Sequence, residues 1–209
     1  SAADTANIVP EIPIALKGRQ YLTKDELAIL DVIASNLWER PIYFSVTTRA
    51  DKMMGFDKYC QLEGLALRLV PVRSEGEPRF GAMLGAGRVN TDKLLDNVFN
   101  KFRWGNFDQR ELFVDNSYGP SVQSQQFMMI RGGETLLQEG RSDEAVELAD
   151  EYFKRFPNYN FPYDYQTAYM LGIYTRAGAS EQARPYMDVL ANNLVAELAF
   201  YASLSPITL

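Results

Sequence analysis

The chain has 209 residues, 46% of them hydrophobic, and carries a net charge of −6 at pH 7 with a sequence pI near 4.8. A nucleic-acid partner is disfavoured, because phosphate backbones are bound by concentrated Lys and Arg and the chain has no basic run. The sequence contains no histidine and one cysteine, Cys60, which excludes an intramolecular disulfide, a histidine-dependent nucleophile and a thiolate metal cluster. We therefore expect no structural transition metal and no cofactor, while a hard cation held by carboxylates stays an alternative.

A helix followed directly by a strand is predicted between residues 19 and 48. Thr23 and Glu26 have the spacing of a capping box, which favours a helix start at this point. Pro41 cannot continue the helix and favours extended geometry in the residue before it. Apolar residues recur at helical spacing before Pro41 and alternate after it, namely Leu27, Ile29, Leu30, Ile33, Ala34 and Leu37, then Ile42, Phe44 and Val46.

Trp38 and Arg40 lie at the joint between this helix and this strand. The favoured interpretation is structural, with the indole of Trp38 buried over the edge of the core. In that case Trp38→Ala should cost about 3–5 kcal/mol, the usual range for deleting a large buried aromatic side chain. The alternative is that Trp38 and Arg40 face a groove and bind a glycan or a peptide.

The stretch up to residue 120 has weaker signals. Residues 1–17 are predicted to be an extended lead-in, and residues 57–63 a short helical turn. Leu65, Leu67 and Leu69 alternate with other residues before Pro71, which predicts a second strand. The glycine-rich residues 74–87 predict a hairpin or a mobile loop. A short amphipathic helix is expected after caps at residues 90–92, with one apolar face made of Leu94, Leu95, Val98, Phe99 and Phe102.

From residue 121 onward the pattern is helical only, and one motif recurs. Gly140-Arg-Ser-Asp-Glu-Ala145 returns as Gly178-Ala-Ser-Glu-Gln-Ala183, at an offset of 38 residues. In each copy we expect the Gly to end one helix and the Ser to cap the next. Gly133 is a small residue where two helices could approach closely. The spacing resembles the tetratricopeptide repeat, whose unit is about 34 residues, but Leu171 and Pro185 depart from that pattern.

The predicted fold class is α+β and mainly helical. A small N-terminal α/β unit with few strands, residues 1–120, is expected to pack on degenerate tetratricopeptide-like helical hairpins, residues 121–209. Because each part alone lacks enough core, we expect the two to form one compact unit.

The sequence offers candidate binding residues but no catalytic set. Residues 153–169 are rich in aromatic side chains, which either fill the turn between the two hairpins or form a recognition surface. Glu39 and Asp51 flank the first strand and are the best, though weak, candidates for a carboxylate pair. The candidate binding residues are Trp38, Arg40, Tyr159, Tyr163 and Tyr165.

A set of motifs gives the chain a family resemblance. In chain order they are Tyr21-Leu-Thr-Lys-Asp-Glu-Leu27, Leu30-Asp31, Asn36-Leu-Trp-Glu-Arg-Pro-Ile-Tyr-Phe44, Gln61-Leu-Glu-Gly-Leu65, Arg68-Leu-Val-Pro71, Arg88-Val-Asn-Thr-Asp92 and Lys101-Phe-Arg-Trp-Gly105. Together they resemble the C-terminal soluble region of a family of large bacterial multi-pass membrane proteins. That family is similar to protein O-mannosyltransferases, which are integral-membrane glycosyltransferases that use lipid-linked sugars.

The resemblance implies a non-catalytic accessory or interaction domain. In such transferases the catalytic carboxylate lies in a loop between membrane helices, and no position of this sequence matches it. The implied location is the extracytoplasmic, periplasmic face of the inner membrane, with attachment through transmembrane helices outside this sequence. The implied partners are the membrane-embedded portion of the same polypeptide, an acceptor protein or glycan, and partner subunits. The alternative is a self-standing soluble hydrolase or transferase, which predicts a cleft with a raised-pKa Asp or Glu.

Overall fold

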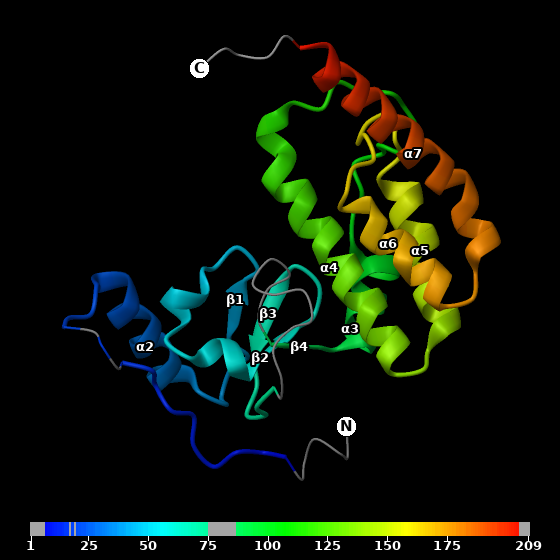
Figure 1. The fold of residues 1–209 in the computed structure, drawn as a ribbon. Coiled ribbons are helices and arrows are strands. Elements are labelled where there is room, and N and C mark those ends of the chain that lie inside the picture. Colours follow the sequence, from blue (N-terminus) through cyan, green and yellow to red (C-terminus); the bar gives the residue numbers. More distant parts are fainter. Residues whose placement is uncertain (1–6, 17, 19, 75–86, 205–209) are drawn as a thin grey trace. The chain divides into compact units, whose positions relative to one another are not determined.

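The computed structural model describes residues 7–16, 18, 20–74 and 87–204, and most of the predicted loop at residues 74–87 lies outside them. The chain divides into two units, Ser1–Lys101 and Phe102–Leu209 (Figure 1). The division falls before the change of pattern at residue 121, because aromatic side chains such as Trp104 and Phe107 pack within the second unit. The packing of the two units as one stays a prediction. The structure has a small sheet and is mainly helical, which confirms the predicted α+β class.

Helix α2, Lys24–Asn36, opens the N-terminal unit and confirms the predicted helix start. The backbone N–H of Thr23 donates to the Glu26 carboxylate at 2.9 Å, as in a capping box. The predicted apolar face is only partly correct, since Ile33 is buried but Leu27 and Ala34 are exposed. The helix turns Glu26 inward instead, where the ammonium of Lys52 lies 3.5 Å from its carboxylate.

A four-stranded sheet forms the centre of the N-terminal unit, in the order β1-β3-β2-β4. Strand β3 (Ala66–Leu69) pairs antiparallel with both β1 (Tyr43–Ser45) and β2 (Cys60–Leu62), and β4 (Arg88–Val89) pairs parallel with β2. The two predicted strands are confirmed as β1 and β3. The predicted helical turn at 57–63 is a 3-10 helix, Phe56–Tyr59, that leads directly into β2. Alternating side chains bury Phe44, Leu67 and Leu69 on one face.

Short helical pieces complete this unit. Another 3-10 helix spans Ala50–Met53. Helix α3, Thr91–Asp96, continues as one turn of π-helix, Asn97–Lys101. The Asn90 side chain accepts from the backbone N–H of Lys93 at 3.1 Å, which confirms a cap in the predicted place. Leu94 and Val98 are buried as expected, whereas Phe99 is exposed.

Cys60 gives the first testable prediction. Its side chain is fully buried, and burial, followed by the charge of Asp57, raises the pKa of the thiol to about 12. Because the thiolate is the reactive form, we expect a disulfide-exchange reagent such as DTNB to find no thiol in the native chain at pH 8. In denaturing guanidinium chloride the same reagent should react with one thiol per chain. Reaction of the native chain at the rate of free cysteine would contradict this placement.

The C-terminal unit is built from two helical hairpins (Figure 1). They consist of α4 (Gly119–Gln138) with α5 (Ser142–Arg155), and α6 (Thr167–Arg176) with α7 (Ser180–Ser203). A 3-10 helix, Asn116–Tyr118, precedes α4. Gly140 and Gly178 take left-handed φ angles of 75° and 84° in the two hairpin turns, as expected of glycines that end helices. This arrangement confirms the predicted hairpins, and the likeness to tetratricopeptide repeats stays a prediction.

Two details of the repeat motif can be compared with the structure. The expected serine caps are wrong: Ser142 and Ser180 are the first helical residues, and neither α5 nor α7 has a side-chain cap. At the start of α5 the Arg141 guanidinium instead bonds the Glu144 carboxylate at 2.6 Å. The expected close approach at Gly133 is present, because a Cβ there would lie 2.6 Å from Cδ1 of Ile173 in α6.

Candidate functional site

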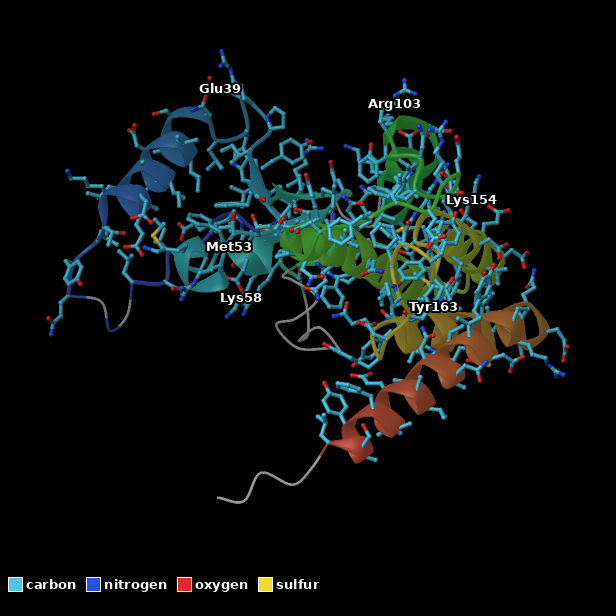
Figure 2. All side chains as sticks on the ribbon, turned by 90° about the horizontal axis from the view of Figure 1, so that it is seen from above. Glu39, Met53, Lys58, Arg103, Lys154 and Tyr163 are labelled. Carbon is cyan, nitrogen blue, oxygen red and sulfur yellow. The ribbon has the colours of Figure 1, made fainter. Side chains whose placement is uncertain are left out.

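The aromatic residues of segment 153–169 mostly fill the core of the C-terminal unit. Phe153 stacks on Tyr186 of α7, with 3.9 Å between ring centroids, and meets Tyr163 edge-on at 5.5 Å. Tyr163 (Figure 2) is therefore buried, so it offers little surface to a ligand, and its binding role stays a prediction. Tyr159 and Tyr165 are 47% and 59% exposed, so these two keep the accessibility that a binding role needs.

The joint after α2 does not bury its tryptophan. Trp38 is 54% exposed and takes a left-handed φ of 66°, and Arg40 is exposed as well. The backbone N–H groups of Glu39 and Arg40 both donate to the Asn36 carbonyl at 3.1 Å, and this tight turn carries the indole away from the core. The expectation of a buried Trp38 is therefore wrong, and the large stability loss that was derived from burial no longer follows.

Trp38 gives the second prediction. Since the side chain is half exposed, Trp38→Ala should change the free energy of unfolding by about 1 kcal/mol or less. Trp38→Gly should be less destabilising than Trp38→Ala, because glycine adopts a left-handed φ without a Cβ penalty. Thermal or denaturant unfolding shows which of the two variants is more stable. If both variants lost several kcal/mol in the free energy of unfolding, the Trp38 side chain would have a structural role after all.

Residues from four of the family motifs meet on the sheet of the N-terminal unit. The strand register places Tyr43, Arg68, Gln61 and Arg88 in one row across the four strands. Beside this row lies the buried carboxylate of Glu63. It accepts from the Gln61 amide at 2.8 Å and from the Tyr43 hydroxyl at 3.3 Å.

Cations complete this cluster. The Lys93 ammonium lies 3.3 Å from the Glu63 carboxylate and the Arg68 guanidinium lies 3.6 Å from it. The Arg88 side chain donates through Nε to Oε1 of Gln61 at 2.8 Å. Burial, and then the negative charge of Glu63, raises the pKa of Tyr43. The polar groups satisfy one another, so we interpret the cluster as a cross-strand network that holds the sheet in register.

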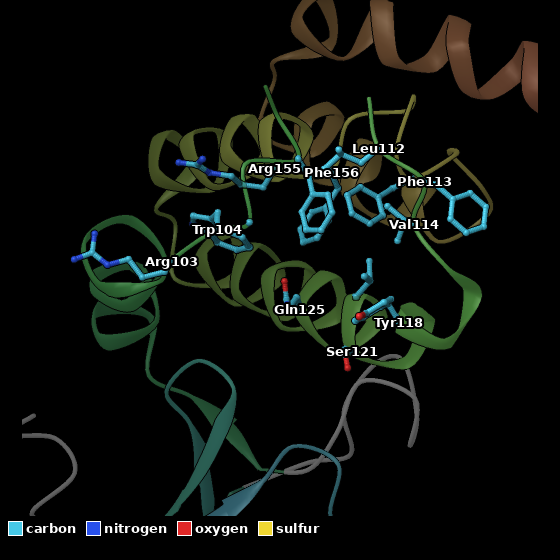
Figure 3. Close-up of a pocket in the computed structure, with 14 residues that line it drawn as sticks. Arg103, Trp104, Leu112, Phe113, Val114, Tyr118, Ser121, Gln125, Arg155 and Phe156 are labelled. Carbon is cyan, nitrogen blue, oxygen red and sulfur yellow. The ribbon is translucent and has the colours of Figure 1, made fainter. Parts of the chain in front are cut away.

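The C-terminal unit contains a pocket with a volume of about 490 Å³, within the usual range of small-ligand sites. One wall is the segment that precedes α4, the second is the first half of α4, and the third is the end of α5 (Figure 3). The lining residues are Arg103, Trp104, Gly105, Phe107, Leu112, Phe113, Val114, Tyr118, Ser121, Val122, Gln125, Arg155, Phe156 and Phe161.

The aromatic walls of the pocket are fixed by edge-on ring contacts. Trp104 meets Phe156 with 5.9 Å between centroids, and Phe107 meets Phe161 at 5.1 Å. The guanidinium of Arg155 lies 5.7 Å from the centre of the Trp104 ring, a cation–π distance.

Asn160 fastens the outer wall. Its side-chain amide donates to the carbonyls of Phe107 and Arg110, each at 2.7 Å, and its oxygen accepts from the backbone N–H of Leu112, also at 2.7 Å. One buried side chain thus satisfies three backbone groups of a segment without regular secondary structure. The wall is therefore preorganised.

The interior of the pocket is apolar and nearly free of net charge. The Arg155 charge is balanced by Glu151 at 2.6 Å and Asp108 at 3.0 Å, and the Arg103 side chain points away from the cavity (Figure 3). No carboxylate is among the lining residues. At the rim, Leu112, Phe113 and Tyr118 are 42%, 93% and 62% exposed. Large apolar side chains on a surface are typical of interaction sites.

The carboxylate pair considered from the sequence does not form part of this pocket. Glu39 is exposed on the surface of the N-terminal unit (Figure 2), and Asp51 bonds the neighbouring Arg49 at 3.0 Å. Among residues 7–74 and 87–204, as far as they are described, no group of three or more Cys, Asp and Glu is placed to hold a metal ion.

None of the five candidate binding residues lines the pocket, although Phe156 and Phe161 belong to the aromatic segment 153–169. The available signal was the number of aromatic residues between Trp104 and Tyr118, in a stretch without periodicity. Those rings come next to Phe156 and Phe161 only in the folded unit.

The motif residues gathered on the sheet agree with a comparison against protein families. Residues 1–93 match the family model TMEM260-associated domain 2. The matched residues contain all four strands of the sheet. The match fits the resemblance to O-mannosyltransferase-like membrane proteins. The pocket lies outside the matched residues. Comparisons with curated proteins and with solved structures give no significant match. Within the described part of the chain, no helix combines the length and apolarity needed to cross a membrane.

Proposed function

We propose that this chain is a non-catalytic recognition domain of a membrane glycosyltransferase-like protein, and that its C-terminal unit binds an apolar side chain of a polypeptide partner. The observation that carries the proposal is the preformed aromatic pocket. Its volume of about 490 Å³ suits one large side chain with its neighbouring backbone. The family match of residues 1–93 supports the link to such a protein.

A polypeptide suits the pocket better than a glycan does. Sugar recognition needs several directed polar groups around an aromatic ring, whereas most of this lining is apolar and its uncharged polar groups come from Gln125, Ser121, Tyr118 and the indole N–H of Trp104. The backbone N–H groups of Phe113 and Val114 donate to no group in the described part of the chain. A bound peptide could pair with them while its side chain enters the cavity.

A binding role also suits the chemistry better than hydrolysis. General acid–base catalysis needs a titratable group within reach of the substrate, and the lining offers no carboxylate. In the proposed role, the domain lies on the extracytoplasmic face of the inner membrane beside the membrane-embedded portion of its polypeptide. The bound partner is then an acceptor protein or a partner subunit.

Tryptophan fluorescence tests the proposal. The chain has two tryptophans, so a Trp38→Phe background leaves Trp104, in the pocket wall, as the sole reporter. We expect millimolar N-acetyl-phenylalaninamide and N-acetyl-leucinamide to shift its emission, and methyl α-mannopyranoside to leave it unchanged. Val122→Phe adds a ring to the cavity and should remove the response to both amides. A response to the mannoside alone, or an amide response unaffected by Val122→Phe, would overturn the proposal.

A further inference from the structure

The last turns of α7 leave the helical hairpins. Leu190 is buried, and the Asn193 side chain donates to Asn158 at 2.8 Å and to the Tyr163 carbonyl at 3.1 Å. Every residue from 194 to 204 is exposed. In Figure 2 the red end of α7 lies apart from the other helices of its unit. Asn193 is therefore the last anchor of the helix.

This exposed end of α7 is apolar. Glu197 is its only charged residue, and its large apolar side chains are Leu194, Val195, Leu198, Phe200, Tyr201 and Leu204, between 37% and 69% exposed. An apolar helix is normally covered by another element. A helix that binds an anionic membrane surface carries Lys and Arg on its polar face, and α7 has none after Arg184. The chemistry thus favours a protein partner.

Two residue pairs on one face of this helix end are related by its midpoint. At about 100° per residue, Ala191, Leu194, Val195, Leu198 and Ala202 fall within an arc of about 100°. About the point between Ala196 and Glu197, Ala191 is related to Ala202 and Val195 to Leu198. If two copies lie antiparallel, alanine faces alanine at each end and Val195 faces Leu198 twice at the centre.

We infer that this face of α7, from Ala191 to Ala202, pairs antiparallel with the same face of a second copy of the chain. With small residues opposite each other at the ends and branched apolar residues opposite each other at the centre, this face is self-complementary, as an isologous interface requires. The alanines permit close approach of the backbones. Glu197 lies about 110° from the centre of the face, so like charges do not meet at the contact. The interface is small, below about 1,200 Å² in total, which predicts transient association in the micromolar range.

Cysteine cross-linking of the full chain tests the pairing and its direction. Ala191→Cys and Ala202→Cys are made separately, then oxidised alone and mixed. In the antiparallel pair Ala191 faces Ala202 of the other copy, while two copies of Ala191 lie about 16 Å apart, too far for a disulfide. We expect a covalent dimer in the mixture only. Cys60 adds no background, because it is buried and its thiol pKa is raised to about 12. Links within either single variant, or none in the mixture, would overturn the pairing.

Sedimentation velocity over a concentration series provides an independent readout. The unmodified chain should gain apparent mass between about 10 and 500 μM, and Leu198→Glu should stay monomeric across that range. Phe200→Glu is the matched control: Phe200 is 60% exposed, close to the 69% of Leu198, but lies on the opposite side of the helix. It should leave association intact. A monomeric unmodified chain, or loss of association in Phe200→Glu but not in Leu198→Glu, would contradict the inference.

Discussion

Phe153→Ala is expected to lower the free energy of unfolding of the C-terminal unit by about 3–5 kcal/mol, the range for removing a large buried aromatic side chain. Phe153 is 3% exposed and its ring contacts Tyr163, Tyr174 and Tyr186. The substitution leaves a cavity, and rings from the α5–α6 turn, α6 and α7 all lose the ring that they contact in common. Chemical denaturation followed by far-ultraviolet circular dichroism measures the change.

Phe113→Ala is the matched control for this substitution. It deletes the same ring from a side chain that is 93% exposed, and Figure 3 shows that ring turned away from the cavity. Its effect on unfolding should stay within about 0.5 kcal/mol, as for other surface positions. If the two variants were equally stable, the aromatic cluster around Phe153 would not be the core of the unit.

The second large effect concerns the ion pair between α4 and α6. Glu134 is 4% exposed, and the Arg176 guanidinium donates to its carboxylate at 2.8 Å through Nη1. Arg176→Met would leave a buried carboxylate without its cation. Such a loss typically costs 3–5 kcal/mol, and because the Arg176 side chain is 45% exposed we expect about 2–3 kcal/mol.

Two comparisons isolate this pair. Arg184→Met breaks an ion pair in which the side chains of Arg184 and Glu181 are 68% and 83% exposed. It should lower the free energy of unfolding by at most about 0.5 kcal/mol. Adding Glu134→Leu to Arg176→Met should recover most of the lost stability, because the uncompensated charge is then absent. If the double variant were less stable than Arg176→Met, Glu134 would stabilise the unit through other contacts.

Local chemistry made the secondary structure largely predictable. The capping box at Thr23 and Glu26 fixes the start of α2 without reference to the rest of the chain, and the glycines at 140 and 178 take the left-handed φ that ends a helix. The alternation around Leu67 and Leu69 likewise predicts β3. These signals depend on residues within a few positions of each other.

Side-chain burial was less predictable, because it depends on residues distant in sequence. Trp38 was expected to be buried, but a turn in which Trp38 itself takes a left-handed φ exposes it. No glycine next to Trp38 indicates such a turn in the sequence. The inward position of Glu26 depends on Lys52, which lies on a later element. The pocket joins Trp104, Val122 and Phe156 from three segments, and no periodicity connects them.

The turn between α5 and α6 links two features of the C-terminal unit. Asn160 fastens it to the pocket wall, and Asn158 accepts from both the Asn193 side chain and the backbone N–H of Tyr163. The wall and the last anchor of α7 are thus bonded to the same few residues. A ligand that displaces the wall has to strain this turn, and the strain reaches α7 where the helix leaves the hairpins. If a ligand binds more tightly to one arrangement of this turn than to another, pocket occupancy is coupled to the anchoring of α7, and the coupling acts equally in both directions.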